Sequence, residues 1–546
     1  MKQKSYSHGL SRHPLLGETI GENLRNSSIK FPDQEALISV EQNYRATYSV
    51  FWQQVTTAAK ALLAINVQKG DRLGIWSPNR YEWVLIQYAT ARIGVILVNI
   101  NPAYRTSELA YVLGQSGVSV LFSALSFKSS DYKAMIEESK SLCENLRDVI
   151  FFDKDWEYFL NQSHNVSDEH LAAVENSIQF DDPVNIQYTS GTTGFPKGVT
   201  LSHYNLLNNG YFVGKRLGYT EKDKVCIPVP FYHCFGMVIG NLCCTSHGAC
   251  MVIPSESFEP LKVLKAVEKE HCTSLYGVPT MFIAELQLPE FDQFNLSSLR
   301  TGVMAGSPCP VEVMKKVQSL MHMKDVQICY GMTETSPVST QTSAETPFEK
   351  QVGTVGTVQD HLEIKIIDPE TGAVQERNQP GELCTRGYAV MLGYWNNAKA
   401  TTEAVDPARW MHTGDLATMD DEGYVNIVGR IKDMILRGVE NIYPREIEEF
   451  LYTHEAIADV QVIGVPSEKY GEEVMAWVKI KSDCSVSANE LINFCSKQIA
   501  HYKIPKYWKF TDGFPMTVTG KIRKVEMRET SIEELGLQEV AKIRTS

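Results

Sequence analysis

The sequence predicts an α/β protein: a large N-terminal domain with two doubly wound sheets and a small β-barrel, then a smaller α+β domain. Three observations support this fold class: the chain length, a repeated strand–helix–strand order, and a change of pattern after residue 350. At 546 residues the chain is too long for one hydrophobic core. Hydrophobic residues make up 43% of it and charged residues 21%, so it can bury ordinary globular cores.

The first doubly wound sheet is predicted between residues 72 and 152. Four short apolar runs are strand candidates: Arg72–Trp76, Val95–Val98, Val118–Phe122 and Val149–Phe152. Residues Tyr81–Ile93 lie between the first two runs and have helical spacing. The order strand, helix, strand implies a parallel sheet with helices on its faces. The preceding residues, 18–67, are predicted to be helical with interruptions.

The same alternation returns after residue 198 and predicts the second doubly wound sheet. Its candidate elements are three strands and a helix: Val225–Pro230, Ala249–Pro254, Pro260–Lys269 (helix) and Ser274–Tyr276. Residues 350–430 change to short alternating runs separated by Gly, Pro and Asp, which indicates the antiparallel strands of the barrel. Strands and helices alternate again from Asp433 onward. We therefore predict domains at residues 1–432 and 433–546.

Composition and charge exclude several classes of function. The net charge is −13, and no basic run is interleaved with aromatic residues, so we expect no nucleic-acid partner. The twelve cysteines show no disulfide spacing and the N-terminus lacks a secretory signal pattern, so we expect a cytoplasmic protein. The longest apolar stretch, residues 235–253, is interrupted by polar residues and predicts no transmembrane segment. The sequence leaves a homodimer open.

The stretch YTSGTTGFPKG, residues 188–198, has the chemistry of a phosphate-binding loop. Its hydroxyls, small residues and single cation are Thr189, Ser190, Gly191, Thr192, Thr193, Gly194 and Lys197. It is not a Walker A loop, because Phe195 and Pro196 separate Gly194 from the lysine. A turn rich in Ser, Thr and Gly is the plain alternative for half of this pattern.

Five further blocks follow in the chain: TGVMAGSPCP (301–310), YGMTETSP (330–337), WMHTGD (410–415), GRIKDMILRGVENIYPREIE (429–448) and PMTVTGKIRK (515–524). The second block offers an aromatic ring for a purine, a hydroxyl for a phosphate and a carboxylate for a metal ion. Each of the shorter blocks alone would be an ordinary turn. Their order along one chain carries more weight than any single match.

Together these blocks resemble the signature motifs of the acyl-adenylate-forming superfamily, over about residues 20–530. The best resemblance is to its medium-chain fatty acyl-CoA synthetase branch, which the stretch GVILVNINPAYRTSELAYVL at residues 94–113 also resembles. This resemblance implies ATP, Mg²⁺ and coenzyme A. It implies activation of a carboxylic acid to acyl-AMP with release of pyrophosphate, then transfer to CoA. It also implies a small domain that turns about a hinge between the two steps.

The resemblance also implies roles for individual residues. The implied ATP and AMP ligands are Thr189, Ser190, Gly191, Thr192, Thr193, Lys197, Gly306, Ser307, Pro308, Tyr330, Gly331, Met332, Asp415 and Arg430. The implied catalytic residues are Lys521, His233, Thr333 and Glu334, with Glu334 also holding Mg²⁺. CoA is assigned to Arg437, Gly438 and Val439, the acyl pocket to Tyr232, Val238 and Gly302 with residues 276–281, and the hinge to Asp433.

One position departs from the family pattern. Relatives usually have two glycines before the Glu-Asn pair, whereas this chain has Gly438 and then Val439. A branched side chain at this position could narrow the family's CoA tunnel, which is lined by backbone. The resemblance therefore supports the adenylation step more strongly than the CoA step. Two main alternatives stay open: a ligase that loads a separate carrier protein, and an aryl-CoA ligase. No feature supports a luciferase-like oxygenase, and Lys521, Glu334 and Asp415 speak against a nucleotide-binding regulator without turnover.

Overall fold

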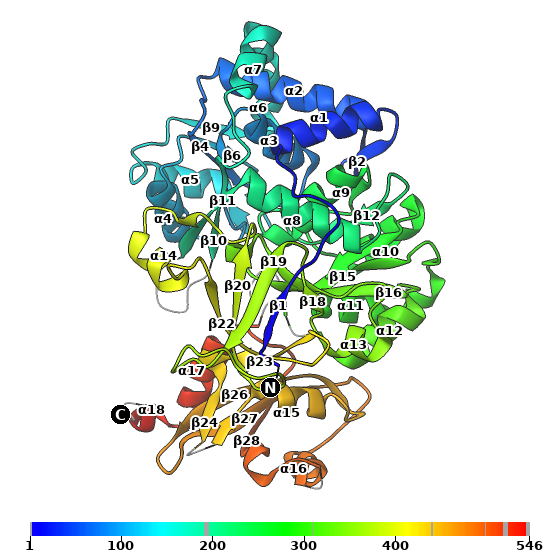
Figure 1. The fold of residues 1–546 in the computed structure, drawn as a ribbon, viewed down its shortest axis with the longest axis vertical. Helices are drawn as coiled ribbons and strands as arrows, with labels where there is room; N and C mark the ends of the chain where they lie inside the picture. The colour runs from blue at the N-terminus through cyan, green and yellow to red at the C-terminus, as the bar shows by residue number, and fades with distance from the viewer. Residues whose placement is uncertain are drawn as a thin grey trace.

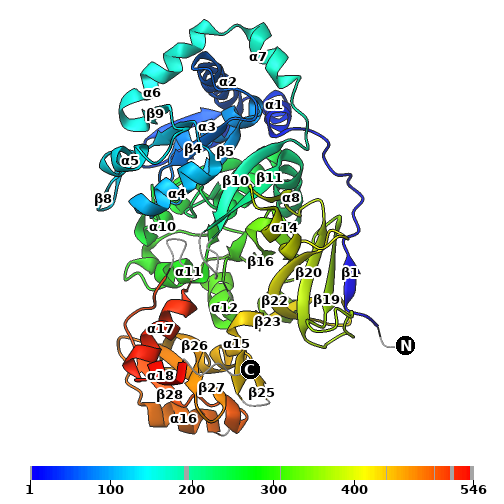
Figure 2. The ribbon, with the colours of Figure 1, turned by 90° about the vertical axis from the view of Figure 1, so that its left-hand side faces the viewer.

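The computed structural model of this chain describes residues 3–189, 196–307, 309–437, 440–496, 498–516 and 522–541, with backbone alone at residues 440 and 441. Figure 1 shows an elongated molecule with the blue and cyan N-terminal helices at one end and the orange and red C-terminal segment at the other. Figure 2 shows the same layers from the side. Among the described residues, no helix has both the length and the apolar content that crossing a membrane requires.

A seven-stranded sheet forms the upper layer, in the order β21-β11-β10-β5-β4-β6-β9. Its strands are β4 (Arg72–Trp76), β5 (Ile96–Asn99), β6 (Val120–Ser123), β9 (Asp148–Phe151), β10 (Pro183–Thr189), β11 (Lys197–Ser202) and β21 (Gly393–Tyr394). The strands from β10 to β9 run parallel, whereas β11 and β21 are antiparallel additions at one edge. The predicted first sheet is therefore present, with each predicted strand within two residues of its place.

A nine-stranded sheet forms the second layer, in the order β18-β17-β16-β15-β14-β12-β13-β2-β3. Its strands are β2 (Glu35–Ser39), β3 (Tyr44–Thr47), β12 (Lys224–Cys226), β13 (Cys250–Ile253), β14 (Ser274–Gly277), β15 (Thr301–Ala305), β16 (Asp325–Gly331), β17 (Val338–Gln341) and β18 (Thr357–Val358). The six central strands are parallel. Parallel strands place their carboxyl ends at one edge of the sheet, where α/β proteins bind their ligands.

The largest hydrophobic core lies between these two sheets. It is filled by α1 (Ile20–Lys30), α2 (Tyr48–Ala64), α3 (Tyr81–Arg92), α8 (His203–Arg216), a π-helix η2 (Phe235–Leu242) and α9 (Cys243–His247). Every residue of α3 after Tyr81 is buried, as expected for a helix enclosed by two layers. Helix α1 begins at a capping box in which Thr19 and Glu22 satisfy each other's backbone N–H groups.

The outer faces of both sheets are covered by further helices. Beside the outer face of the seven-stranded sheet lie α4 (Thr106–Ser116) and α5 (Tyr132–Lys140), whereas α6 (Phe152–Asn161) and α7 (Asp168–Glu175) pack with α2 in the largest core. Beside the nine-stranded sheet lie α10 (Pro260–Glu270), α11 (Pro279–Leu286), α12 (Val311–Leu320) and α13 (Phe348–Gly353). Both sheets are thus doubly wound, as predicted.

An antiparallel five-stranded sheet stands where the small barrel is predicted, in the order β1-β19-β20-β22-β23. Its strands are β1 (Tyr6–His8), β19 (Leu362–Ile367), β20 (Gly381–Gly387), β22 (Met411–Met419) and β23 (Val425–Arg430), and α14 (Ala398–Ala404) lies in the loop before β22. Strand β1 comes from the start of the chain and runs along β19 (Figure 2).

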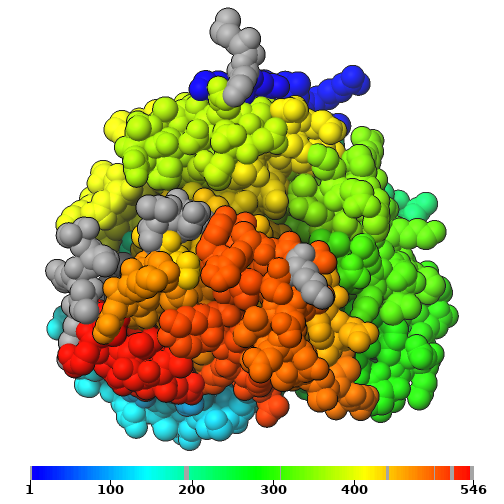
Figure 3. Space-filling view, turned by 90° about the horizontal axis from the view of Figure 1, so that it is seen from below, coloured from blue at the N-terminus to red at the C-terminus, as the bar shows by residue number. Residues whose placement is uncertain are grey.

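The C-terminal segment forms its own α+β unit with two small cores. Its strands are β24 (Ile435–Arg437), β25 (Glu440–Ile442), β26 (Ile457–Ser467), β27 (Gly471–Ile480) and β28 (Tyr507–Phe510). Its helices are α15 (Pro444–Leu451), α16 (Ala488–Ser496), α17 (Lys524–Glu534) and α18 (Gln538–Ala541). Seen from below, this orange and red unit covers the end of the molecule between the yellow and green parts (Figure 3). The boundary at Asp433 stays a prediction.

Two local features differ from the sequence prediction. The interruption within residues 18–67 is a β-hairpin, in which β2 pairs antiparallel with β3 and joins the second sheet through β13. The apolar run after Cys234 forms a π-helix, which 3.6-residue periodicity cannot indicate. Both differences arise because tertiary packing decides the local structure at these places.

Glu285 provides a test of the hydrophobic core beside the nine-stranded sheet. Its side chain on α11 is fully buried, and neither carboxyl oxygen has a hydrogen-bond partner among the described residues. Burial raises the pKa of this carboxyl well above its usual value, so burying it costs free energy at neutral pH. We expect Glu285→Met to increase the free energy of unfolding at pH 7 by about 1 to 3 kcal/mol, measured by urea denaturation.

The stability difference between glutamate and methionine at position 285 should depend on pH. In the unfolded chain the Glu285 carboxyl ionises near its ordinary pKa, whereas in the folded protein it stays neutral to a higher pH. Glu285 therefore lowers the free energy of unfolding at pH values above its ordinary pKa. Below that pKa this destabilisation disappears. The advantage of methionine should therefore shrink as pH falls to about 4. Exposed Glu290 is the control, and Glu290→Met should change stability by less than about 0.5 kcal/mol. A destabilised Glu285→Met protein would contradict this account.

Candidate active site

A carboxylate, a phenol and a guanidinium meet where β16 and β23 end against the middle of β22. The Tyr330 hydroxyl at the end of β16 donates to Asp415 Oδ2 at 2.7 Å, and Arg430 Nε lies 3.0 Å from Asp415 Oδ1. Asp415 and Arg430 are direct cross-strand partners on β22 and β23. Burial and the neighbouring Asp415 carboxylate raise the pKa of Tyr330, which stays a neutral donor. Three residues predicted far apart in sequence thus form one polar cluster.

The Thr-Gly-Asp segment lies at an irregularity within β22 and is held by its own hydrogen bonds. Thr413 Oγ1 donates to the Leu383 carbonyl at 2.7 Å and accepts from the Asp415 N–H at 3.1 Å. The Gly414 N–H donates to Glu382 Oε1 at 3.1 Å. Gly414 has φ +70°, a conformation that favours glycine. The Thr-Gly-Asp sequence therefore fixes the direction of the Asp415 side chain.

A second cluster joins Glu334, Tyr394 and Lys197. Glu334 is 5% exposed, and its Oε1 accepts a hydrogen bond from the Tyr394 hydroxyl at 2.9 Å. Lys197 Nζ lies 4.9 Å from the centroid of the Tyr394 ring. Burial raises the pKa of Glu334, and the Tyr394 hydrogen bond and Lys197 oppose that rise. A buried carboxylate beside a lysine suits Mg²⁺, which takes one or two carboxylates and completes its shell with phosphate and water oxygens.

The ends of the predicted phosphate loop are fixed by strand pairing. Thr189 ends β10, Lys197 begins β11, and the two residues are antiparallel partners. The residues between them that carry most of the prediction, Ser190, Gly191, Thr192 and Thr193, lie outside the described residues. The described Thr189 lies at the carboxyl end of β10, which runs parallel to β5.

The remaining predicted nucleotide ligands lie at the carboxyl ends of β15 and β16, two parallel neighbours. Gly306 has φ +92° and is followed by half-buried Ser307, whereas Pro308 lies outside the described residues. A Cβ at Gly331 would lie 1.8 Å from the Pro337 carbonyl oxygen, so only glycine fits there. Met332 follows, and buried Thr333 opens the short helix η4 (Thr333–Thr335).

A cavity of about 330 Å³ lies near the predicted acyl pocket. Tyr232 lines it together with Thr280 and Met281. Val238 is instead buried inside the π-helix, and Gly302 lies within β15, where an added Cβ would be 2.1 Å from the Leu275 carbonyl oxygen. The cavity is therefore lined by only part of the predicted set.

His233 follows the cavity-lining Tyr232 and is half-buried. Its Nδ1 accepts the Phe235 N–H at 3.1 Å, so the assigned neutral tautomer carries its proton on Nε2. The backbone carbonyl of His233 also accepts from Gly236 and Met237, which fixes the start of the π-helix. The structure thus holds the ring in one orientation.

The residues predicted for the hinge and the CoA tunnel belong to the C-terminal side. Asp433 ends the short helix η5 (Ile431–Asp433), directly after Arg430. Arg437 Nε pairs with Glu473 Oε1 at 2.9 Å, and its guanidinium lies 4.0 Å from the Tyr470 ring centroid. Gly438, Val439 and Lys521 lie outside the described residues.

The C-terminal unit also touches the β23 strand that carries Arg430. Arg445 Nη1, on α15, donates to the Ile427 carbonyl at 2.8 Å. Close to Lys521 in sequence, Met516 and Ile522 form an antiparallel bridge. The C-terminal unit is thus docked on the strand that leads into the Asp415 cluster.

Sequence reasoning missed Tyr394 and Glu382. Tyr394 lies in the sequence GYW, whose only signal is an aromatic residue after a glycine, and its partner Glu334 is sixty positions away. Glu382 is an acid in a strand that reads as ordinary alternation. Neither role is visible before β11 pairs with β21 and β20 pairs with β22.

Family models match most of the chain. The model described as AMP-binding enzyme matches residues 24–395, and the one described as AMP-binding enzyme C-terminal domain matches residues 446–521. The chain belongs to the AMP-binding enzyme family. The acyl-adenylate-forming superfamily, the fold class and the AMP-forming ligase class predicted from the sequence are therefore confirmed.

Similar proteins cover the chain almost completely. It is 47% identical to Bacillus subtilis YngI, which is named as an acyl-CoA synthetase, over 96% of this chain and 99% of the relative. It is 43% identical to the Danio rerio mitochondrial medium-chain acyl-CoA ligase ACSF2, over 98% and 91%. The structure of ATP-bound MatB from Rhodopseudomonas palustris matches with a TM-score of 0.81 at 25% identity, over 95% of this chain and all of MatB.

The Tyr394–Glu334 hydrogen bond predicts a pH effect. Because this bond lowers the pKa of Glu334 against the effect of burial, Tyr394→Phe should raise that pKa further. The ionised carboxylate is then lost at a higher pH as pH falls. We expect the acidic limb of kcat/KM for ATP to move upward by about one pH unit.

The control for this variant is Tyr424→Phe. Tyr424 directly precedes β23, and Lys350 Nζ lies 5.2 Å from the centroid of its ring, a contact that phenylalanine keeps. Its pH profile should match that of the unmodified enzyme. If the acidic limb of the Tyr394→Phe profile does not shift, ionisation of Glu334 does not set this limb.

Proposed function

We propose that the protein is an AMP-forming acyl-CoA synthetase that acts on medium-chain fatty acids. It joins the acid to ATP as acyl-AMP with release of pyrophosphate, and then transfers the acyl group to CoA with release of AMP. The observation that carries this proposal is the Asp415–Tyr330–Arg430 cluster beside the Glu334–Tyr394–Lys197 cluster. The names of YngI and ACSF2 support the acyl-CoA product, and the name of ACSF2 supports the medium chain length.

The first cluster has the chemistry to hold a nucleoside. Asp415 offers two carboxylate oxygens to the two ribose hydroxyls, and Arg430 offers a donor on the same side. The Tyr330 ring supplies an apolar face for adenine while its hydroxyl keeps Asp415 in place. Gly306 and Ser307 lie at the adjoining strand end, where backbone can approach the base.

The second cluster has the chemistry to hold the phosphates. Lys197 and the hydroxyls of Thr189 and Thr333 face a site where negative charge grows as the acid carboxylate attacks the α-phosphorus. Mg²⁺, when bound at Glu334, supplies further positive charge to the phosphate oxygens. The acid is already ionised at neutral pH, so the step needs positioning and fixed charge rather than a general base.

The remaining assignments are part of the same proposal. Lys521 reaches the α-phosphate during adenylation, and the C-terminal unit turns about Asp433 to admit CoA at Arg437. His233 and Tyr232 border the reacting carboxylate, and the 330 Å³ cavity beside Tyr232 receives part of the acyl or thiol substrate. The Arg445 contact to Ile427 must break or move during that turn.

Acid-dependent exchange of labelled pyrophosphate into ATP tests the first half-reaction. We expect exchange with Mg²⁺ and octanoate, weaker exchange with butyrate and palmitate, and little with benzoate. Adding CoA should then give a thioester detectable by mass spectrometry. Exchange that is strongest with benzoate would favour the aryl-CoA alternative, and acyl-AMP that reacts with a carrier protein but not with CoA would favour the carrier alternative.

Val439 provides a prediction for the second half-reaction. If its side chain narrows the CoA tunnel, Val439→Gly should speed thioester formation from supplied acyl-AMP and CoA several-fold, as followed by rapid quench. Adenylation measured by pyrophosphate exchange should not change. An unchanged thioester rate would remove Val439 from the account.

The cellular location and the assembly state also belong to the proposal. We infer a reducing, cytoplasmic location from twelve cysteines without disulfide spacing, although the ACSF2 relatives are named as mitochondrial. Cell fractionation with an antibody to the chain separates the two locations. Light scattering of the purified protein decides whether a homodimer forms.

A further inference from the structure

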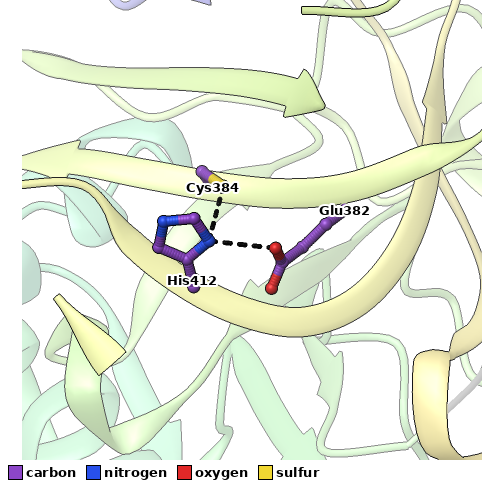
Figure 4. Close-up of side chains that lie close together, drawn as sticks. All are labelled: Glu382, Cys384 and His412. Atoms are coloured by element: carbon purple, nitrogen blue, oxygen red, sulfur yellow. Dashed lines mark hydrogen bonds and ion pairs between the residues drawn. The ribbon is translucent and has the colours of Figure 1, made fainter. Parts of the chain in front are cut away.

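Three different metal-binding side chains converge on the antiparallel sheet, outside the proposed catalytic clusters. Glu382 and Cys384 come from β20, and His412 comes from the neighbouring strand β22 (Figure 4). One ligand atom from each lies within 4.8 Å of the other two, and these are the only three residues in the described part of the chain that meet this condition. From this geometry, we propose that Glu382, Cys384 and His412 form a binding site for a zinc-like divalent cation.

The oxygen of Glu382 and the sulfur of Cys384 both point at the same ring nitrogen of His412. His412 Nδ1 is 2.9 Å from Glu382 Oε2 and 3.6 Å from Cys384 Sγ. A tetrahedral Zn²⁺ with ordinary bond lengths separates a nitrogen and a sulfur ligand by roughly 3.5 Å and a nitrogen and an oxygen ligand by roughly 3.4 Å. The sulfur is therefore already in place, and the carboxylate must move by about 0.5 Å.

The other ring nitrogen faces a further carboxylate. His412 Nε2 lies 3.9 Å from Asp406 Oδ2, while Asp406 Oδ1 is held by the Trp410 N–H at 2.9 Å. Without an ion, Nδ1 donates to Glu382; a metal ion at Nδ1 would displace that proton, and the Nε2–H would then face Asp406. Histidine ligands of metals commonly have such a partner. The orientation of the ring thus suits binding through Nδ1.

Burial and charge favour a cation with one open side. Cys384 is fully buried and Glu382 is 13% exposed, whereas the His412 side chain is 31% exposed and gives an ion a path from solvent. Two carboxylates and one thiol surround the ring, with Lys365 as the nearby cation that acts on Cys384. Soft thiolate and imidazole ligands select Zn²⁺ over Mg²⁺, so this site differs in chemistry from Glu334.

The site is linked to the nucleotide cluster through one side chain. Glu382 turns Oε2 to His412 and Oε1 to the Gly414 N–H, next to Asp415. An ion on Oε2 leaves the hydrogen bond on Oε1 intact. The bound ion would therefore cross-link β20 to β22 next to the Thr-Gly-Asp segment.

Cobalt titration of the whole, chelator-treated protein tests the proposal. Co²⁺ bound to a thiolate gives a charge-transfer absorption band in the near ultraviolet, whereas Co²⁺ on carboxylates and phosphates alone does not. We expect this band to saturate at one Co²⁺ per chain, Zn²⁺ to abolish it, and the thermal midpoint to rise with Zn²⁺. A protein without the band, or one whose Zn²⁺ does not displace it, would overturn the site.

Variants separate this site from other thiols. Cys384→Ser should lose the band, whereas Cys484→Ser, at an exposed cysteine elsewhere, should keep it. Asp406→Asn should keep the band and weaken Co²⁺ binding by about 10-fold to 100-fold. If circular dichroism shows that Cys384→Ser is misfolded, His412→Asn takes its place and must lose saturable binding. A band that survives in a folded Cys384→Ser or His412→Asn protein overturns the assignment.

Discussion

Replacing Asp415 with alanine should lower kcat/KM for ATP by about two to four orders of magnitude. The carboxylate offers both oxygens to ribose, and each charge-assisted hydrogen bond is worth about 1.5 to 3 kcal/mol. Two such bonds correspond to about 3 to 6 kcal/mol, with a tenfold rate for each 1.4 kcal/mol. The substitution also leaves the Tyr330 hydroxyl and Arg430 without their shared acceptor. Steady-state pyrophosphate exchange measures the loss.

The control lies in the same hairpin. Asp421 is exposed in the turn between β22 and β23, and Asp421→Ala should leave kcat/KM within about twofold. Circular dichroism and the thermal midpoint check that both variants fold. Equal activity of Asp415→Ala and the unmodified enzyme would show that ribose is held elsewhere.

Replacing Lys521 with alanine should reduce adenylate formation by about two to three orders of magnitude. The lysine is proposed to stabilise the negative charge that develops at the α-phosphate, and loss of one such donor costs about that much. Thioester formation from supplied acyl-AMP and CoA should stay within about threefold, because the proposed turn of the C-terminal unit removes Lys521 before that step.

Single-turnover assays of the two half-reactions separate these effects. The matched control is Lys524→Ala, a nearby lysine whose Nζ pairs with Glu448 at 2.6 Å and which has no proposed contact with ATP. It should leave both half-reactions near their original rates. Equal losses of both steps in Lys521→Ala would contradict the division of labour between the two domain positions.

The sequence predicts the sheets well because their strands are strongly patterned. The predicted strand Arg72–Trp76 matches β4 residue for residue. The hairpin β2–β3 was not predicted, and its place in the second sheet depends on β2 pairing with β13, more than two hundred residues away. The π-helix after Cys234 could not be predicted either, since all of its residues are buried and leave no polar face that would show a helical period.

The candidate site was predictable in its residue types but not in its contacts. The motifs supply Tyr330, Asp415 and Arg430. Only the packing of β16, β22 and β23 brings Tyr330 and Arg430 to the Asp415 carboxylate. Tyr394 escaped prediction because its role depends on Glu334 from another layer. The Glu382–Cys384–His412 cluster escaped because its members alternate along β20 and pair across to β22, a spacing that matches no zinc motif.

Direct detection of acyl-AMP tests the central claim, that this chain makes a carboxylic acid reactive by joining it to AMP. The enzyme at high concentration is mixed with ATP, Mg²⁺ and octanoate without CoA, quenched with acid and analysed by mass spectrometry. We predict octanoyl-AMP and pyrophosphate in amounts close to that of the enzyme, and loss of both signals in Asp415→Ala. Cleavage of ATP without an AMP ester of octanoate or of any other acid offered would contradict the account.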